Sequence, residues 1–224
     1  MTGYYLTILE GAALTVAVSL ASLLVAILLG LAGASAKLSG RKPLVAAATL
    51  YTTLVRGVPE LVLMLLIFYG GTIGLNAMME AMGSEQTIDI EPFAAGVITI
   101  GFIYGAYMTE TFRGAILAVD KGELEAARAF GMRATQVFVR ILFPQMMRHA
   151  LPGFGNNWLV LLKTTALVSI IGLDDMVRKA SLAAGSTQQP FTFYMAVALI
   201  FLIFTAVSTS ALKWAERHYA IKTR

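Results

Sequence analysis

The sequence predicts an all-α integral membrane protein with five transmembrane helices. Of its 224 residues, 58% are apolar and only 13% are charged, and the mean hydropathy is +0.75. Soluble domains carry about 25% charged residues. The apolar residues form runs long enough to cross a bilayer, since a helix needs about 20 residues to span about 30 Å of hydrocarbon. We find no internal repeat or long linker, which predicts one membrane domain over residues 1–224.

Five runs with few or no charges are long enough to span the membrane. The first exceeds the apolar core of a signal peptide, about 7 to 15 residues, and no Lys or Arg precedes it, so we expect a retained helix. The third extends toward Ile116. The fourth is entered through Pro152 and interrupted by Lys163, and the fifth follows Pro190, which suits a first helical turn. The predicted spans are residues 11–36, 61–79, 92–109, 151–173 and 191–212.

A sixth apolar stretch, residues 43–55, is too short to cross the membrane. Gly57 and Pro59 separate this stretch from the second span, and they are expected to break the helix between the two. We therefore predict that residues 43–55 form a short helical piece that lies along the membrane interface.

The positions of Lys and Arg predict the orientation of the chain, because cytoplasmic loops carry an excess of these residues. Acidic residues gather instead in residues 76–91, although Arg178 and Lys179 fall on the same outer side. We predict a periplasmic N-terminus and a cytoplasmic C-terminus. The cations that lie on the predicted cytoplasmic side are Lys37, Arg41, Lys42, Lys121, Arg128, Arg133, Arg140, Arg148, Lys213, Arg217, Lys222 and Arg224.

Charge, cysteine content and motifs exclude several kinds of protein. The net charge is +4, but the basic residues are spaced between apolar runs, so we expect no nucleic-acid partner. The sequence contains no Cys, which excludes a disulfide framework and a thiolate metal site. It also lacks the phosphate-binding motif G-x-x-x-x-G-K-[ST], so this chain is not itself an ATPase.

The longest predicted cytoplasmic loop, about residues 119–148, contains the polar stretch GELEAARAFGMRATQVFVRILFPQ. Its composition predicts a helix over residues 123–130, a turn at Gly131 and a second helical piece over residues 136–143 that leads up to Pro144. Such an element is either a solvated helical loop or a docking surface. Small side chains favour docking because they permit close approach by another surface. These side chains are Ala126, Ala127 and Ala129.

The stretch EAARAFG, followed after nine residues by ILFP, resembles the EAA loop of the permease subunits of ABC importers. Phe143 stands where that family usually has Leu. The segments LVRGVPELVLMLLIFYG, GAYMTETFRGAILAV and NNWLVLLKTTALVSIIG are similar to permeases for polar amino acids, and among these to subunits of basic amino-acid uptake systems. The positions that match the EAA loop are Glu125, Ala126, Ala127, Gly131, Ile141 and Pro144.

This resemblance implies a type I ABC-importer permease fold in a bacterial inner membrane, with import of arginine, ornithine, lysine or histidine. It implies three protein partners: an ABC ATPase dimer on which the EAA loop docks, a second homologous permease chain and a periplasmic amino-acid-binding protein. ATP and magnesium are expected on the ATPase, and no cofactor is expected on this chain. Import of another polar amino acid, such as glutamine or glutamate, is the alternative.

Ionisable side chains near or within the spans are candidates for the substrate path, since a charge at membrane depth is costly unless it faces a cavity or a partner. Glu60 begins the second span, where relatives with other specificities usually have an apolar residue, and its carboxylate is a candidate to attract a cationic amino acid. The structural alternatives are stabilisation of the helix N-terminus or an ion pair with Arg56 or Lys163. Lys163 itself either binds a carboxylate of the substrate or neutralises a buried acid.

The remaining candidates have structural explanations of equal or greater weight. Glu110 and Arg113 are three residues apart and are expected to pair along one helix face. Asn157 either lines a polar cavity or hydrogen-bonds to a neighbouring helix. Asp174 and Asp175, at the outer end of the fourth span, are either part of an outer gate or solvated end charges.

Two other functional classes fit the sequence less well. An ion-coupled secondary transporter would also use membrane carboxylates, but many such folds are built from internal repeats. A membrane enzyme would need a catalytic cluster, and the His, Ser and acidic residues show no spacing expected of one. We therefore expect a transport subunit and not an enzyme.

Overall fold

The computed structural model describes residues 2–83, 86 and 89–219, and of Thr2 only the backbone. This part of the chain is helical and contains no strand. The helices are α1 (Thr2–Leu38), α2 (Lys42–Gly57), α3 (Glu60–Ala81), α4 (Pro92–Leu117), α5 (Lys121–Ala129), α6 (Ala134–Val137), the π-helix η1 (Phe138–Leu142), α7 (Phe143–Thr164), the 3₁₀ helix η2 (Thr165–Ser169), α8 (Met176–Thr187) and α9 (Pro190–Tyr219).

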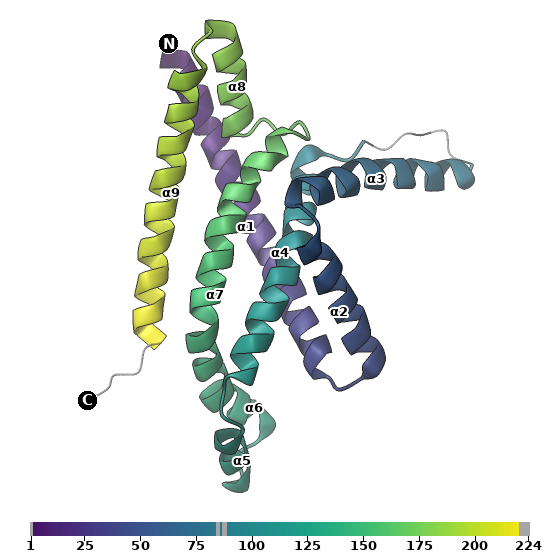
Figure 1. The fold of residues 1–224 in the computed structure, drawn as a ribbon, viewed down its shortest axis with the longest axis vertical. Coiled ribbons are helices and arrows are strands. Elements are labelled where there is room, and N and C mark those ends of the chain that lie inside the picture. The colour runs from purple at the N-terminus through teal and green to yellow at the C-terminus, as the bar shows by residue number, and fades with distance from the viewer. Residues whose placement is uncertain (1, 84–85, 87–88, 220–224) are drawn as a thin grey trace.

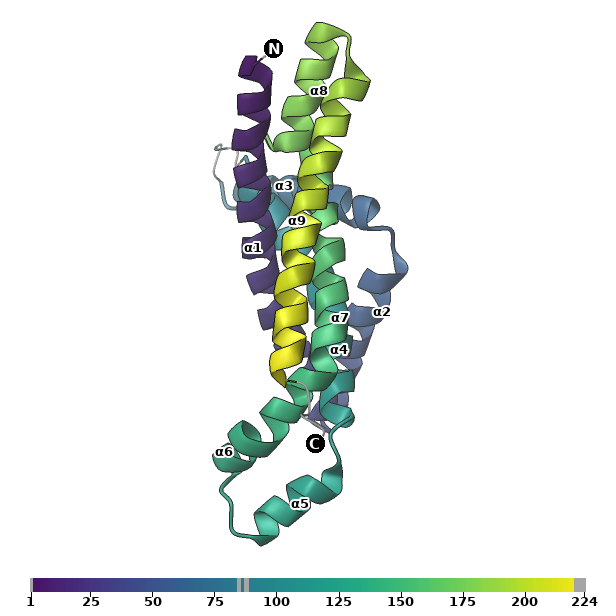
Figure 2. The same cartoon turned by 90° about the vertical axis from the view of Figure 1, so that its left-hand side faces the viewer.

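Helices α1, α4, α7 and α9 run along the long axis of the molecule (Figures 1 and 2). Helix α4 packs against α1 and α7, and α9 packs against α7 and α8. The two ends of the bundle differ: α8 and the N-terminus lie at one end, the α8 end, whereas α5 and α6 project from the other, the α5 end (Figure 1). Buried side chains in the centre include Val18, Ala26, Met64, Ile100, Ile103, Tyr104, Met108 and Leu161.

Glycines allow α1 and α4 to approach closely. A Cβ placed on Gly101 of α4 would lie 2.5 Å from Val25 Cγ1 of α1, and one on Gly33 of α1 would lie 2.3 Å from Thr109 Oγ1 of α4. Both distances are too short for any side chain larger than hydrogen. In a membrane, where helices cannot gain from the hydrophobic effect, such close contact is a main source of association energy.

Replacing Gly101 with alanine is therefore expected to lower the midpoint of thermal unfolding, because overpacking a core costs about 1 to 3 kcal/mol. Gly114→Ala is the matched control, since it lies on the same helix and an added Cβ there has nothing within 4 Å. Thermal unfolding of the purified protein measures both variants. Equal midpoints for the two would contradict this account of the α1–α4 contact.

Within the described residues, four helices are long and apolar enough to cross a membrane: α1 from Gly3 onward, α3, α4 and α9. These correspond to the first, second, third and fifth predicted spans. Helix α7 is less apolar, because polar and charged residues occur along its length, yet it packs lengthwise against α4 and α9. The polar and charged residues that lower its hydropathy include Gln145, Arg148, His149, Asn156, Asn157 and Lys163.

Helices α2 and α3 exchange the directions that the sequence predicts for them. Helix α2 runs lengthwise and packs on α1 and α4, whereas α3 lies across the long axis of the bundle (Figure 1). The predicted break between them is present: Val58 is extended, with φ −111° and ψ 139°, and Pro59 precedes α3. The prediction that residues 43–55 lie along the interface is wrong, because the break marks a bend without specifying its angle.

The fourth apolar run begins earlier and ends earlier than predicted. Helix α7 starts at Phe143, so that Pro144 lies in its first turn and Pro152 inside it. The π-helix η1 ends at Leu142, two residues before Pro144, and its wider turn accommodates a residue that cannot donate an N–H. The helical piece therefore does not stop at Pro144. At the other end, Thr165–Ser169 is 3₁₀ and Gly172 turns the chain with φ +99°.

Candidate functional site

Glu60 lies where α3, α4 and α7 meet. Its Oε1 accepts a hydrogen bond from the Tyr104 hydroxyl at 2.9 Å, and its Oε2 accepts one from Thr164 Oγ1 at 2.9 Å. The two hydroxyl oxygens are themselves 2.7 Å apart. Tyr104 is 2% exposed and Thr164 6%, whereas Glu60 is only half-buried. We call these three residues the Glu60 cluster; it holds a carboxylate with one side open to the outside of the chain.

Neither ion pair that the sequence offered for Glu60 forms within the described residues. Arg56 instead places its guanidinium 5.3 Å from the centroid of the Tyr107 ring, and that ring lies 5.6 Å from the ring of Tyr104. Lys163 is exposed, next in sequence to Thr164. Arg56 and Lys163 are therefore close in sequence to residues of the Glu60 cluster. No cation in the described residues forms an ion pair with the Glu60 carboxylate.

Glu110 belongs to a separate cluster nearer the α5 end. The predicted pair along α4 is confirmed: Arg113 Nε donates to Glu110 Oε2 at 3.0 Å. The other oxygen, Oε1, accepts from Lys37 Nζ of α1, which also donates to Thr52 Oγ1 of α2 at 2.7 Å. Glu110 thus ties three helices together and has both oxygens occupied. Sequence reasoning missed Lys37 and Thr52, because no local pattern links them to Glu110.

Asn157 joins α7 to α4. Its Nδ2 donates to Thr111 Oγ1 at 2.9 Å and lies 3.8 Å from the Met108 sulfur. Of the two alternatives that the sequence left open, the structure shows the hydrogen bond between helices. Inside a membrane such bonds contribute roughly 0.6 to 2 kcal/mol.

The two outer aspartates occupy different environments. The Asp174 side chain is 70% exposed and accepts from Arg178 Nε at 2.9 Å, which fits a solvated end charge. Asp175 is fully buried as the N-cap of α8; its Oδ1 accepts from the Arg178 backbone N–H at 3.0 Å, while Oδ2 has no partner among the described residues. Burial raises the pKa of the Asp175 carboxyl from 3.8 to about 6, against the opposing effect of its hydrogen bonds from backbone N–H groups.

This raised pKa predicts how stability depends on pH. The folded chain binds the Asp175 proton more tightly than the unfolded chain, so the stability from this carboxyl is greatest below its ordinary value of 3.8 and is lost as pH rises toward 6. Asp175→Asn cannot ionise and still caps a helix. We expect it to raise the thermal midpoint at about pH 8 and to do so less at about pH 5. Asp174→Asn is the exposed control, and a pH-independent effect of Asp175→Asn would contradict the prediction.

The EAA segment forms a helical hairpin that projects from the α5 end of the bundle (Figure 2). Helix α5 begins at the N-cap Asp120, whose carboxylate accepts from Gly122 N at 2.6 Å. The helix ends in a Schellman turn: Met132 N donates to Ala127 O at 3.1 Å, and Gly131, with φ +79°, donates to Arg128 O at 2.9 Å. The turn predicted at Gly131 is confirmed, and its positive φ explains the glycine.

The residues of the EAA motif divide between the inside and the outside of this hairpin. Glu125 and Ala126 are exposed on α5, whereas Ala127 is 6% exposed and packs internally. Ile141 and Pro144 are half-buried at the start of the return into the bundle. A second set of exposed side chains is apolar, in a segment that otherwise carries charges. These are Phe130, 89% exposed, Val139, 61% exposed, and Phe138, 49% exposed.

A family of proteins described as the binding-protein-dependent transport system inner membrane component matches residues 22–221 of this chain. The chain is 55% identical over 219 residues to the histidine/lysine/arginine/ornithine transport system permease protein HisQ of Escherichia coli (strain K12), covering 98% of this chain and 96% of that protein. It belongs to this family. The permease is also 41% identical over 214 residues to the octopine transport system permease protein OccQ of Rhizobium radiobacter, with 96% and 90% of the two chains covered.

Solved structures agree with this assignment. The permease superposes on a chain of an amino acid ABC transporter crystallised with histidines, with a TM-score of 0.81 and 32% identity over 97% of this chain and 96% of that one. It shares the fold of a chain of the MetNI methionine ABC transporter, with a TM-score of 0.70 and 15% identity over 96% and 94% of the chains. The resemblance to ABC-importer permeases is confirmed. The chain is a multi-pass transport subunit of the inner membrane.

Proposed function

We propose that this permease carries basic amino acids from a periplasmic binding protein into the cytoplasm, driven by ATP hydrolysis on a separate ATPase dimer. The Glu60 cluster is the observation that carries this proposal. A half-buried carboxylate, held by two hydroxyl donors and without an ion-pair partner in the described part of the chain, is suited to a guanidinium or ammonium group. The names of two relatives, the histidine/lysine/arginine/ornithine permease HisQ and the arginine permease ArtQ, give substrates that are also basic amino acids.

Lys163 is the proposed partner of the carboxylate end of the substrate. Every free amino acid carries an α-carboxylate, and Lys163 is an exposed cation beside Thr164 of the Glu60 cluster. The pair Glu60 and Lys163 would therefore favour a substrate with a cationic end and a carboxylate end. Glu110, Arg113 and Asn157 act as ties between helices in this proposal, because their polar groups are already engaged.

The α5 end faces the cytoplasm and the α8 end faces the periplasm. Helices α1, α2, α4, α7 and α9, which run along the bundle, then make five crossings, and the N-terminus lies outside. The concentration of Lys and Arg in and beside the EAA segment supports this direction. The buried Asp175 at the α8 end then belongs to the periplasmic side, where the loaded binding protein would press on α8 as part of the outer gate.

The EAA hairpin docks on the ATPase. Phe130 is 89% exposed next to the Gly131 turn, an unfavourable position for an aromatic side chain in water unless a partner covers it. Glu125 and Ala126 lie exposed on the same short helix. ATP and magnesium are held by the ATPase, and its closure would move α5 and, through η1, helix α7.

A second homologous permease chain covers α3. This helix extends across the bundle axis, and of its residues only Met64 is fully buried. Its exposed side chains would pack against the partner permease and the surrounding lipid. They include Leu66, Ile73 and Met78, which are 62%, 71% and 62% exposed.

ATP-dependent uptake of labelled arginine by the complete complex in proteoliposomes tests the proposed function. We expect competition by ornithine, lysine and histidine and none by glutamine or glutamate. Competition by the latter two would contradict the substrate class and leave the transport function in place. Uptake that persists without the ATPase would contradict the energy source and favour an ion-coupled transporter.

A further inference from the structure

The guanidinium of Arg56 stacks on an aromatic ring next to the Glu60 cluster. Its Cζ atom lies 5.3 Å from the centroid of the Tyr107 ring, inside the limit of about 6 Å for a cation–π contact. The Tyr107 ring lies 5.6 Å from the Tyr104 ring, and the Tyr104 hydroxyl donates to Glu60 Oε1. A cation, an aromatic face and a carboxylate are therefore neighbours where α2, α3 and α4 meet.

Arg56 is loosely held on this ring. It is exposed in the last turn of α2 and takes part in no ion pair or side-chain hydrogen bond within the described residues. Exposed cation–π contacts are weak, because water competes for the cation. Tyr107, in contrast, is half-buried and packs against the buried core of the bundle, so the ring keeps its place when the guanidinium leaves.

The Glu60 carboxylate accepts fewer hydrogen bonds than it can. Each of its oxygens accepts one from a hydroxyl group, whereas an ionised carboxylate has about four acceptor positions. Arg56 precedes Glu60 by only one helical turn of sequence and still does not pair with it, because its guanidinium lies on the Tyr107 ring. A free guanidinium would find both partners here: its N–H groups bond to the open side of the carboxylate, and its flat face stacks on the ring.

Stacking on a ring distinguishes arginine from the other basic amino acids. A guanidinium is planar and weakly hydrated, and it stacks well on aromatic faces, whereas the ammonium of lysine or ornithine is compact and strongly hydrated. The Glu60 carboxylate attracts both kinds of cation. The Tyr107 ring therefore adds a preference that the carboxylate alone does not provide.

We infer that the Glu60 carboxylate and the Tyr107 ring together form a site for the guanidinium group of arginine, and that Arg56 occupies the ring until the substrate displaces it. This inference rests on the proposed function and deepens it. Arginine is then the preferred substrate of the site, and Arg56 is a competitor built into the chain. Such a competitor lowers the apparent affinity for arginine in proportion to the fraction of chains whose ring is free.

Substitution of the ring tests the first half of the inference. Binding of labelled arginine and of labelled lysine is measured at equilibrium on the complete membrane complex in nanodiscs, without the binding protein, so that only the permease chains select the ligand. We expect Tyr107→Leu to weaken arginine binding by about three- to tenfold and lysine binding by less than about twofold, because leucine keeps the bulk and removes the π face. Tyr107→Phe keeps the face and is the matched control. Equal losses for arginine and lysine in the leucine variant would overturn the role of the ring.

Substitution of Arg56 tests the second half. Arg56→Gln is expected to tighten arginine binding by at least about threefold in the same assay, because it frees the ring. Arg56→Lys keeps the charge but stacks less well, so it should also tighten binding, to a smaller extent. In the double variants with Tyr107→Leu, most of both gains should disappear. Gains of the same size with and without the ring would be an effect of charge and would overturn the displacement.

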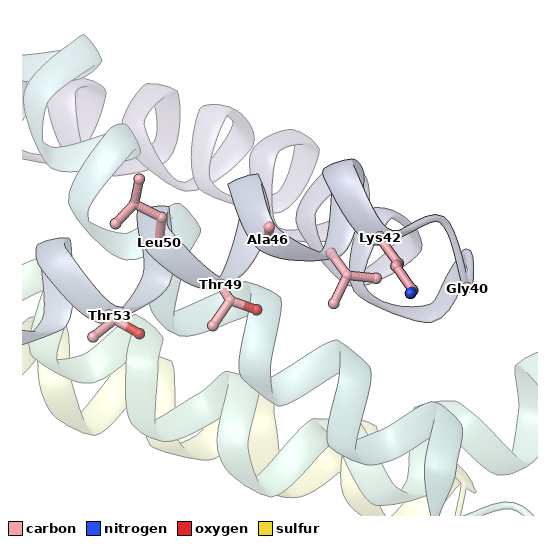
Figure 3. A pocket seen from close by; sticks show the side chains of 7 residues that line it. Gly40, Lys42, Ala46, Thr49, Leu50 and Thr53 are labelled. Carbon is pink, nitrogen blue, oxygen red and sulfur yellow. The ribbon is translucent and has the colours of Figure 1, made fainter.

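Lys42→Gln is the control for the loss of a cation from α2. Lys42 is exposed at the other end of this helix and lines an open hollow that contains no residue of the Glu60 cluster (Figure 3). We expect this variant to bind arginine like the unaltered chain. A gain equal to that of Arg56→Gln would overturn the displacement, because loss of any cation from α2 would then have the same effect.

Glu60→Gln in the same assay separates this inference from the proposed function. If it weakens arginine binding while the Tyr107 and Arg56 variants bind like the unaltered chain, the proposed substrate site stands and the inference alone fails. If Glu60→Gln binds arginine unchanged, the proposed substrate site itself fails. An Arg56→Gln variant with a lower midpoint of thermal unfolding and unchanged binding would assign Arg56 to the C-terminus of α2, where a cation stabilises a helix, and would overturn its role as a competitor.

Discussion

Gly131→Val is expected to abolish binding-protein-stimulated uptake while leaving the permease inserted in the membrane. Gly131 holds φ +79° in the turn that closes α5, a conformation that a β-branched residue adopts only at considerable cost. The valine chain would lose the bonds from Gly131 N to Arg128 O and from Met132 N to Ala127 O. Helix α5 would then fray, and the surface proposed to meet the ATPase would lose its shape. ATP-dependent uptake and ATP hydrolysis by the complete complex measure the effect.

Gly131→Asn is the matched control for this change. An added Cβ at Gly131 has no neighbour within 4 Å, so bulk alone costs nothing in the isolated chain. Asparagine tolerates the left-handed region better than other residues with a side chain. We expect the asparagine variant to keep most of its uptake. If the valine variant transported normally, the turn would have no part in coupling; if both variants failed equally, a steric contact with the ATPase would replace backbone conformation as the cause.

Glu60→Gln is expected to lower the efficiency of arginine uptake by about 10- to 100-fold, because a hydrogen bond to a charged group contributes about 1.5 to 3 kcal/mol. Glutamine has nearly the same shape; its amide oxygen can accept from one of the two hydroxyls and its NH2 can donate to the oxygen of the other, so the change removes the charge and keeps both contacts. Competition for arginine uptake by lysine should weaken in parallel, while any residual transport of a neutral amino acid should not.

Tyr104→Phe distinguishes the effect of the charge on Glu60 from the effect of the hydrogen bond that positions its carboxylate. It keeps the buried ring and removes the hydroxyl that lies 2.9 Å from Glu60 Oε1. We expect a smaller loss of uptake and no change in the order of competing substrates. If Glu60→Gln instead lowered the thermal midpoint with an unchanged order of competing substrates, Glu60 would serve the N-terminus of α3 and not the substrate.

Helices whose bounds depend on local composition were predictable. Residues 92–109, with their extension toward Ile116, became α4 (Pro92–Leu117), and residues 191–212 became α9 (Pro190–Tyr219). In both cases proline precedes an apolar run, and the missing N–H of proline is harmless in a first turn. The turn at Gly131 was predictable for a similar local reason, because few residues other than glycine close a helix with positive φ.

Helix α8 was missed although the sequence contains a signal for it. Asp175 is an N-cap residue immediately before Met176–Thr187, and its side chain accepts from Arg178 N as N-caps do. The predicted fourth span ends at residue 173, just before this N-cap, and no separate helix was predicted after it. That Asp175 would be buried, unlike its neighbour Asp174, depends on α1 packing over it and has no counterpart in local sequence.

The partners of Glu60 and Glu110 could not be predicted either. Tyr104 and Thr164 are 44 and 104 residues from Glu60, and Lys37 is 73 residues from Glu110. The sequence singled out the two carboxylates because an ionisable group in an apolar run is unusual. Glu110 pairs with cations, whereas Glu60 accepts hydrogen bonds from hydroxyl groups. This difference depends on how the helices pack.

The sequence by itself determined the membrane class, most of the helices, the EAA hairpin and the absence of a phosphate-binding loop, since each follows from composition or from residues close together in the chain. Only the tertiary structure decided that α3 lies across the bundle and α2 along it, that Glu110 is paired while Glu60 has no cation partner in the described residues, and that Asp175 is buried. These features depend on the angle of the bend at Pro59 and on contacts between distant helices. No local pattern encodes them.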